Sequence, residues 1–163
     1  MGNFLGIDAS TQSMTGLVID TSSSQIVVEK SVNFDEHYAE KYGVENGVLD
    51  ANTSVVHSPP LMWAEALETL FCQLRDSGID LTSIEAISGS GQQHGTVYLN
   101  QSAAGVLGGL RSDLSLAEQL GDVFSRPTAP VWMDTSTRLQ CDEIEAGVGG
   151  RQVARGVHGG LAL

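Results

Sequence analysis

FLGIDASTQSMTGLVID, at residues 4–20, is the stretch that decides the fold. An apolar run ends at Asp8, a turn of small hydroxyl and amide residues follows, and a second β-rich run begins at Thr15. This order predicts a β-hairpin. The N–H and hydroxyl donors of such a turn can face phosphate oxygens, and an acid that closes the first strand can organise a hydrated Mg²⁺. From these residues alone, an ordinary hairpin with a polar turn is an equal alternative.

The composition of the 163-residue chain restricts its classes of function. With 41% hydrophobic residues, the chain can bury a core and is expected to form one domain or a part of a larger one. Eight basic against twenty acidic side chains give a formal net charge of −12, which repels polyanions, so nucleic acid is not expected as a partner. A nucleotide is compatible with this charge, because a local nest of N–H groups and a metal ion can bind phosphate at any net charge.

Targeting and metal-binding patterns are also weak. The sequence has no run of about 18 apolar residues that would span a bilayer, and its first residues lack the pattern of a signal peptide. We therefore expect a cytoplasmic protein with no membrane partner. Cys72 and Cys141 lie outside any CxxC pair, and the four histidines have no metal-ligand spacing, so neither a disulfide framework nor a zinc site is expected.

Beyond the first hairpin, the pattern predicts a third strand over residues 25–34, an irregular excursion over 35–58 and a helix that Ser58 caps ahead of two prolines. That helix carries an apolar stripe at helical spacing, formed by Trp63, Leu67, Leu70, Phe71 and Leu74. The other expected elements are strands at 84–88, 96–100 and 130–134, a short helix near 114–120, and a helix from Thr135 or Ser136 to Ala146. Hairpin strands followed by strand and helix alternation indicate an α/β domain with a mixed sheet covered by helices.

The familiar nucleotide and hydrolase motifs do not match this sequence. A Walker loop needs a Gly-Lys pair, which the chain lacks, and the glycines at 89–95 follow a GxGxxxG spacing with strand-like residues behind them. A nucleophile elbow would need glycines two residues on either side of Ser90, where Ser88 and Gln92 stand. The loop between Gly91 and Gly95 does carry three neighbouring polar side chains that suit a hydroxyl-rich ligand, namely Gln92, Gln93 and His94. A strand-connecting loop with a solvated histidine is the alternative.

Four blocks of the sequence resemble the FGGY carbohydrate kinases, and in particular the eukaryotic-type xylulokinases. The blocks are DASTQ at 8–12, SPPLMWAEAL at 58–67, ISGSGQQHGTVYLN at 87–100 and APVWMDTSTRLQCDEIEA at 129–146. They follow the family's order and span most of the chain. The resemblance implies an incomplete ribonuclease-H-like domain of the actin/hexokinase type. In this family, ATP and sugar bind in a cleft between that domain and a second one.

On the phosphate side, the resemblance assigns roles to the first hairpin. Asp8 matches the family's metal- and phosphate-organising acid, which implies Mg²⁺ as a cofactor together with ATP. Ser10, Thr11 and Gln12 match the phosphate-binding turn.

On the sugar side, Gln93 and His94 match the loop that contacts the substrate in the family. Trp132 and Asp134 match a W-x-D segment that lies near the sugar site. For this last pair, a buried aromatic residue and a helix-capping acid are an equal alternative.

The sequence also departs from the family pattern. The family's general base is an aspartate that is expected beyond Leu163, so no catalytic residue is assigned in this chain, and the second, ATP-binding domain is absent. We expect residues 1–150 to form the N-terminal part of the first kinase domain. Residues 151–163 form an atypical tail, with Leu161 where relatives have a sugar-contacting arginine. An artificial truncation, a frameshift or a degraded gene would each account for such an ending.

The resemblance therefore implies the N-terminal part of an ATP-dependent kinase for a small-molecule sugar, a pentulose and in the first place D-xylulose. Phosphoryl transfer needs positioning from both sides of a cleft, so the chain alone is expected to be inactive or nearly so. Two alternatives stay open. One is a different FGGY substrate, such as ribulose, glycerol or gluconate, and the other is a non-catalytic remnant. The sequence does not indicate an oligomeric state.

Overall fold

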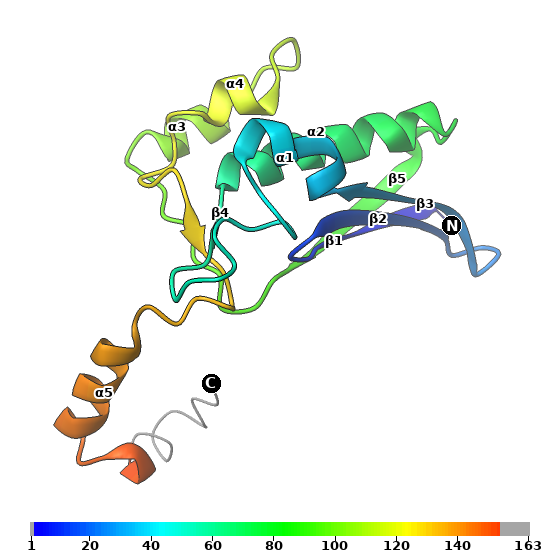
Figure 1. The fold of residues 1–163 in the computed structure, drawn as a ribbon. Helices are drawn as coiled ribbons and strands as arrows, with labels where there is room; N and C mark the ends of the chain where they lie inside the picture. Colours follow the sequence, from blue (N-terminus) through cyan, green and yellow to red (C-terminus); the bar gives the residue numbers. More distant parts are fainter. Residues whose placement is uncertain (1, 154–163) are drawn as a thin grey trace.

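A computed structural model describes residues 2–153 and contains a mixed β-sheet (Figure 1). Within these residues the sheet has four strands in the order β3-β2-β1-β5. The strands are β1 (Asn3–Ala9), β2 (Ser13–Asp20), β3 (Gln25–Asn33) and β5 (Ile84–Gly91). The first three strands pair antiparallel with their neighbours, whereas β1 and β5 pair parallel. The predicted α/β fold with a mixed sheet is confirmed.

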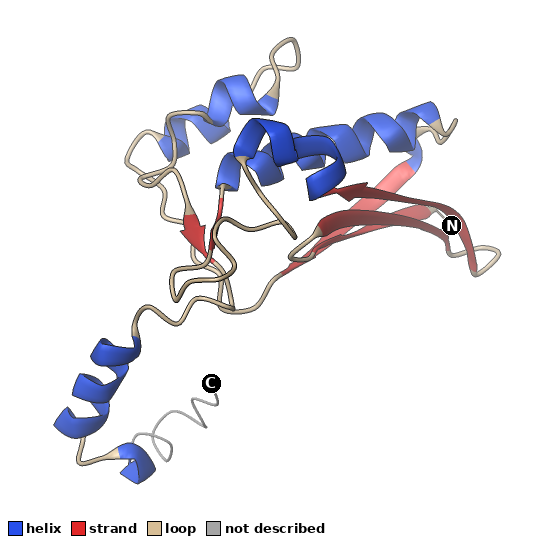
Figure 2. Ribbon diagram, in the orientation of Figure 1, coloured by secondary structure: helices blue, strands red, loops and turns tan. Residues whose placement is uncertain are grey.

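The core lies between this sheet and the two helices α1 (Phe34–Tyr42) and α2 (Pro60–Asp76), which cover the same face (Figure 2). The strands supply buried apolar residues at alternate positions, such as Met14 and Val18. Of the predicted apolar stripe of α2, Leu70 and Leu74 are fully buried against them, and the other three residues are half-buried. Met62 and Ala66, which the predicted stripe does not include, complete the buried face of the helix. Helix and sheet approach closely because β2 has Gly16 at this point: an added Cβ would lie 3.2 Å from Leu70 Cδ2.

Beside this core lies a second, smaller sheet of two short strands. The strands β4 (His57–Ser58) and β6 (Ala129–Pro130) pair antiparallel. Beside them, Val48, Val56 and Val131 form a small apolar cluster. The short helices are η1 (Leu81–Ser83), α3 (Ala103–Gly108) and α4 (Leu116–Leu120), and α5 (Arg138–Gly147) extends away from the rest of the domain (Figure 1).

None of the helices within residues 2–153 has the length and apolar character needed to cross a bilayer. Leu161 and residues 154–163 of the predicted tail lie outside the described residues.

The predicted third strand is one residue too long, and the predicted excursion after it is partly helical. The strand ends at Asn33 because the Asn33 side chain caps α1, accepting a hydrogen bond of 3.1 Å from the Glu36 backbone N–H. Phe34 is thus the first residue of a helix, and its side chain is buried in the core.

Ser58 does not cap α2, contrary to the prediction. It is fully buried in β4, where its Oγ donates 2.7 Å to the carbonyl oxygen of Gly47, and α2 begins at Pro60 with Pro59 at the N-cap. Ser58 therefore fixes a loop rather than a helix end. The start of α5 was also predicted too early, since its N-cap is Thr137 and not Thr135 or Ser136.

Two predicted strands are wrong or shortened. Residues 96–100 form an irregular segment with a single bridge between Leu99 and Phe124, because hydrogen bonds such as Asn100 N–H to Val123 O join it to a loop rather than to a strand. Of the predicted strand at 130–134, the structure keeps only Pro130, in β6. The Asp134 N–H then bonds to the Val131 carbonyl oxygen, so the chain turns there instead of extending.

The tight contact of α2 with β2 gives a test of the fold. Leu70→Ala is expected to lower the free energy of unfolding by about 2–5 kcal/mol, because it leaves a cavity at a fully buried position. Leu139→Ala, on α5 at 74% exposure, is the matched control and is expected to change it by less than about 0.5 kcal/mol. Urea unfolding measures both, and equal effects of the two substitutions would contradict the described core.

Candidate functional site

The parallel pairing of β1 with β5 brings two strand ends to the same edge of the sheet. Asp8 is paired with Ser90, and Ala9 with Gly91, in the last positions of the ladder. Because parallel strands run in the same direction, the turn after β1 and the loop after β5 leave the sheet together. Two segments that lie far apart in the sequence therefore meet there.

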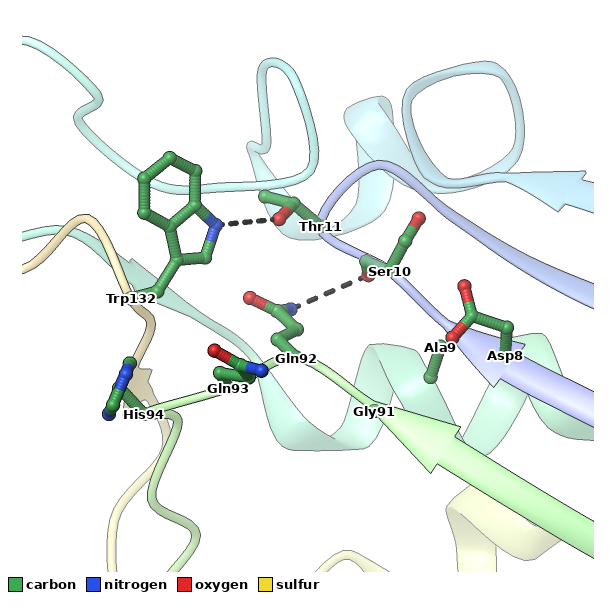
Figure 3. Close-up of a pocket in the computed structure, with 9 residues that line it drawn as sticks. All are labelled: Asp8, Ala9, Ser10, Thr11, Gly91, Gln92, Gln93, His94 and Trp132. Atoms are coloured by element: carbon green, nitrogen blue, oxygen red, sulfur yellow. Dashed lines mark hydrogen bonds between the residues drawn. The ribbon is translucent and has the colours of Figure 1, made fainter.

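A cavity of about 330 Å³ lies between these two segments (Figure 3). Its lining consists of Asp8, Ala9, Ser10, Thr11, Gly91, Gln92, Gln93, His94 and Trp132. The structure thus brings together six of the eight predicted site residues. The other two, Gln12 and Asp134, are not part of the lining.

Asp8 lies at the mouth of the cavity, at the end of β1, and is exposed. Its Oδ1 accepts a hydrogen bond from Ser90 Oγ. Within residues 2–153, no group of three or more histidine, cysteine or acidic side chains is arranged to hold a metal ion. A single carboxylate nevertheless suits Mg²⁺, which keeps several waters and is commonly held by one or two carboxylates together with substrate phosphates.

The turn after β1 is closed on itself. The Ser10 N–H donates to the Ser13 carbonyl oxygen at 2.9 Å, and the Ser10 hydroxyl donates to the same oxygen at 3.0 Å. Gln12 does not line the cavity, and its Nε2 donates to Asn46 Oδ1 at 3.3 Å.

A second turn, at residues 45–48, packs against the turn after β1. Gly47 has φ of +76°, and an added Cβ would lie 2.0 Å from the Thr11 carbonyl oxygen, so only glycine fits there. The Asp35 carboxylate holds the second turn by accepting from the N–H groups of Asn46 at 2.6 Å and Gly47 at 2.8 Å. The Thr11 backbone is therefore packed tightly and not free to move outward.

The loop after β5 supplies the opposite wall. His94 has φ of +59°, in the left-handed region that costs a non-glycine residue about 1–2 kcal/mol. Ser24, Asn46 and Asp50 share this conformation and lie outside the cavity lining, so it is the place of His94 in the lining that favours a role in binding.

Gln92 is a lining residue that was not included among the predicted contacts. Its Nε2 donates to the Ser10 carbonyl oxygen at 3.5 Å, whereas its Oε1 is buried and has no hydrogen-bond partner in the described part of the chain. A ligand hydroxyl could donate to that oxygen. The signal was present in the sequence, since Gln92 belongs to the same glycine-flanked polar loop as Gln93 and His94.

Trp132 closes the cavity from a third direction (Figure 3). Its Nε1–H donates 2.9 Å to Thr11 Oγ1, across 121 positions of sequence, while 53% of the residue stays exposed. The indole therefore has one polar anchor on the turn and a free ring face, the arrangement that aromatic residues use to contact ligands.

Asp134 follows Trp132 by two residues, and its side chain is only 6% exposed. The carboxylate accepts from the Val56 N–H at 2.8 Å and from the N–H and hydroxyl of Ser136, and it lies 3.4 Å from His57 Nε2. Burial opposes ionisation of this group, but the hydrogen bonds from Ser136 and Val56 and the proximity of His57 outweigh it, so the pKa of Asp134 is lowered. In this structure the ionised carboxylate binds protein groups, and its predicted contact with a sugar stays a prediction.

No protein-family model matches the chain, but curated proteins do. Xylulose kinase 2 of Arabidopsis thaliana is 44% identical over 149 residues, which cover 90% of this chain and 26% of the relative. The xylulose kinase of Mus musculus is 40% identical over 149 residues, covering 91% of this chain and 27% of the relative. The chain spans about a quarter of the length of the curated relatives it matches.

The fold also has solved counterparts. The crystal structure of a xyloylose kinase from Brucella ovis matches with a TM-score of 0.68 and 20% identity, over 99% of this chain and 26% of the other. That match supports the fold alone, which is of the actin/hexokinase type. In its sequence and its fold, the chain is therefore similar to a part of a xylulokinase-like member of the FGGY carbohydrate kinases.

Proposed function

We propose that this chain is the N-terminal part of an ATP-dependent kinase that phosphorylates a pentulose, D-xylulose in the first place. The observation that carries the proposal is the single cavity shared by the turn after β1 and the loop after β5. The xylulose kinases among the relatives support the choice of sugar.

The turn after β1 is the proposed phosphate side of this cavity. When bound, Mg²⁺ would neutralise charge on the transferred phosphoryl group, and Asp8 is the residue that would hold it. The Thr11 hydroxyl accepts from Trp132 and keeps its own proton for a phosphate oxygen, whereas the Ser10 N–H and hydroxyl would have to leave the Ser13 carbonyl oxygen to donate to phosphate. Gln12 supports the turn through its bond to Asn46.

The loop after β5 and Trp132 form the proposed sugar side. Gln93 and His94 are exposed at the cavity and combine donors and acceptors, which suits hydroxyl groups that both donate and accept. The ring of Trp132 supplies an apolar face, and Asp134 supports the segment that carries it.

The proposed scheme assigns neither the general base nor the adenine site to the described residues. We propose that residues 1–150 belong to the first kinase domain, and that the general base and the adenine-binding domain correspond to the remaining three quarters of the relatives' length. The 163-residue chain alone is then expected to give no ATP consumption above background with any sugar.

A chimera tests the function directly. The region of the Arabidopsis thaliana relative that matches this chain is replaced by the corresponding residues of this chain, and ATP consumption is measured with D-xylulose, D-ribulose, glycerol and gluconate. D-xylulose is expected to give the highest kcat/KM. Equal rates with all four compounds would refute the substrate assignment.

In the same chimera, Asp8→Asn is expected to lower kcat by roughly 10²-fold or more, because it removes the charge proposed to organise the metal and the phosphates. Asp142→Asn, an exposed position on α5, is the matched control and is expected to leave kcat unchanged. An Asp8→Asn variant with the activity of the control would remove Asp8 from the proposed phosphate site.

The strained backbone at His94 gives a separate prediction. His94→Gly is expected to raise the stability of the chain by up to about 1 kcal/mol, because glycine adopts a positive φ without strain, while D-xylulose binding measured by calorimetry is lost. Ser24→Gly is the matched control, since Ser24 also has a positive φ, of +57°, but lies in the turn after β2 and far from the cavity lining. It should give a similar gain in stability with sugar binding unchanged. Unaltered binding in His94→Gly would contradict a ligand role for His94.

A further inference from the structure

The segment that carries Trp132 is attached at both of its ends to the segment before α2. On one side, β6 pairs with β4, and the Val131 N–H donates to the Val56 carbonyl oxygen at 3.1 Å. On the other side, the Thr135 N–H donates to the Ser54 carbonyl oxygen at 2.9 Å. Trp132 thus lies on a short loop whose two ends are both hydrogen-bonded to the segment before α2.

His57 is the side chain that contacts both ends of this loop. Its Nδ1 lies 2.9 Å from Thr128 Oγ1, and its Nε2 lies 3.4 Å from Asp134 Oδ2. The contact with Thr128 is a hydrogen bond whose donor depends on the tautomer of the ring, and the contact with Asp134 is at ion-pair distance. A single ring therefore spans the residues that precede and follow Trp132.

The position of the Trp132 indole depends on this anchored loop. Trp132 makes a side-chain hydrogen bond to Thr11 and is otherwise half exposed, so the position of its ring follows the position of its backbone. The backbone of Trp132 belongs to residues 128–136, which are hydrogen-bonded to the segment before α2 and not to the four-stranded sheet that carries the rest of the cavity.

We propose that His57 is a positioning residue, whose imidazole bridges Thr128 and Asp134 and thereby holds the Trp132 indole against Thr11 at the mouth of the cavity. This assigns a role in the site to a residue that is not in the cavity lining. Its relevance to sugar binding rests on the proposed function, but the geometric claim does not.

The indole N–H signals of the intact 163-residue chain report on this claim, because the chain has two tryptophans. Thr11→Val assigns the Trp132 signal, since it removes the acceptor of that N–H. In His57→Ala, the Trp132 signal is expected to move toward its position in Thr11→Val, and its hydrogen exchange is expected to accelerate about fivefold, as for the loss of one hydrogen bond. Trp63 packs against the core and also against the cluster of Val48, Val56 and Val131, so its signal is expected to move less than that of Trp132.

The controls separate positioning from a general loss of structure. His57→Gln keeps a donor and an acceptor and is expected to retain most of the wild-type Trp132 signal. His37→Ala, on the exposed side of α1, is expected to change neither signal. If His57→Ala unfolds the chain, Thr128→Val decides the matter, because it removes one of the two bridges and leaves the imidazole in place.

An unmoved Trp132 signal in His57→Ala, or in Thr128→Val where the alanine variant unfolds, would overturn the proposal. So would a wild-type Trp132 N–H that already exchanges at the rate of a free indole. A titration with D-xylulose separates this proposal from the proposed function. If the sugar moves no signal in the wild type while His57→Ala still moves Trp132, the function fails and the positioning role stands.

Discussion

The parallel pairing of β1 with β5 is the constraint on which the rest of this structure depends. It joins two strands that lie more than 70 residues apart in the sequence, and it places Asp8 beside Ser90 at the edge where both strands end. An antiparallel partner would have sent its loop to the opposite edge. The shared cavity, and with it the proposed meeting of a phosphate group and a sugar, follows from the direction of one strand.

The walls of the cavity are held by contacts that come from outside the sheet. Gly47 allows a second turn to pack against the Thr11 carbonyl oxygen, and the Asp35 carboxylate holds that turn in place. Trp132 reaches the same threonine from the other direction. The Thr11 residue is therefore fixed both by its backbone and by its side chain, so the turn is organised before any ligand binds. Such preorganisation lowers the entropic cost of binding.

The sequence predicted local features better than features that depend on distant partners. The hairpin, the apolar stripe of α2 and six of the eight site residues in the cavity follow from local pattern or from motifs. The predicted capping role of Ser58 is wrong because its hydroxyl, although suited to a helix cap, donates to the carbonyl oxygen of Gly47, eleven residues away. Residues 96–100 read as a strand because they are β-prone, yet no neighbouring strand pairs with them in the described residues. The role of Asp134 depends on Val56 and His57, which no spacing within its own motif reveals.

Mapping two ligands on the isotope-labelled chain tests the central claim most directly. D-xylulose and Mg-tripolyphosphate would be titrated separately, and the shifts of the backbone amide signals recorded. The account predicts that the sugar shifts signals from Gly91 to Gly95 and that the phosphate shifts those from Ala9 to Ser13, with each ligand affecting the adjoining wall. Shifts confined to another part of the chain, such as the surface between α1 and α4, would contradict it, as would a complete absence of shifts at both walls.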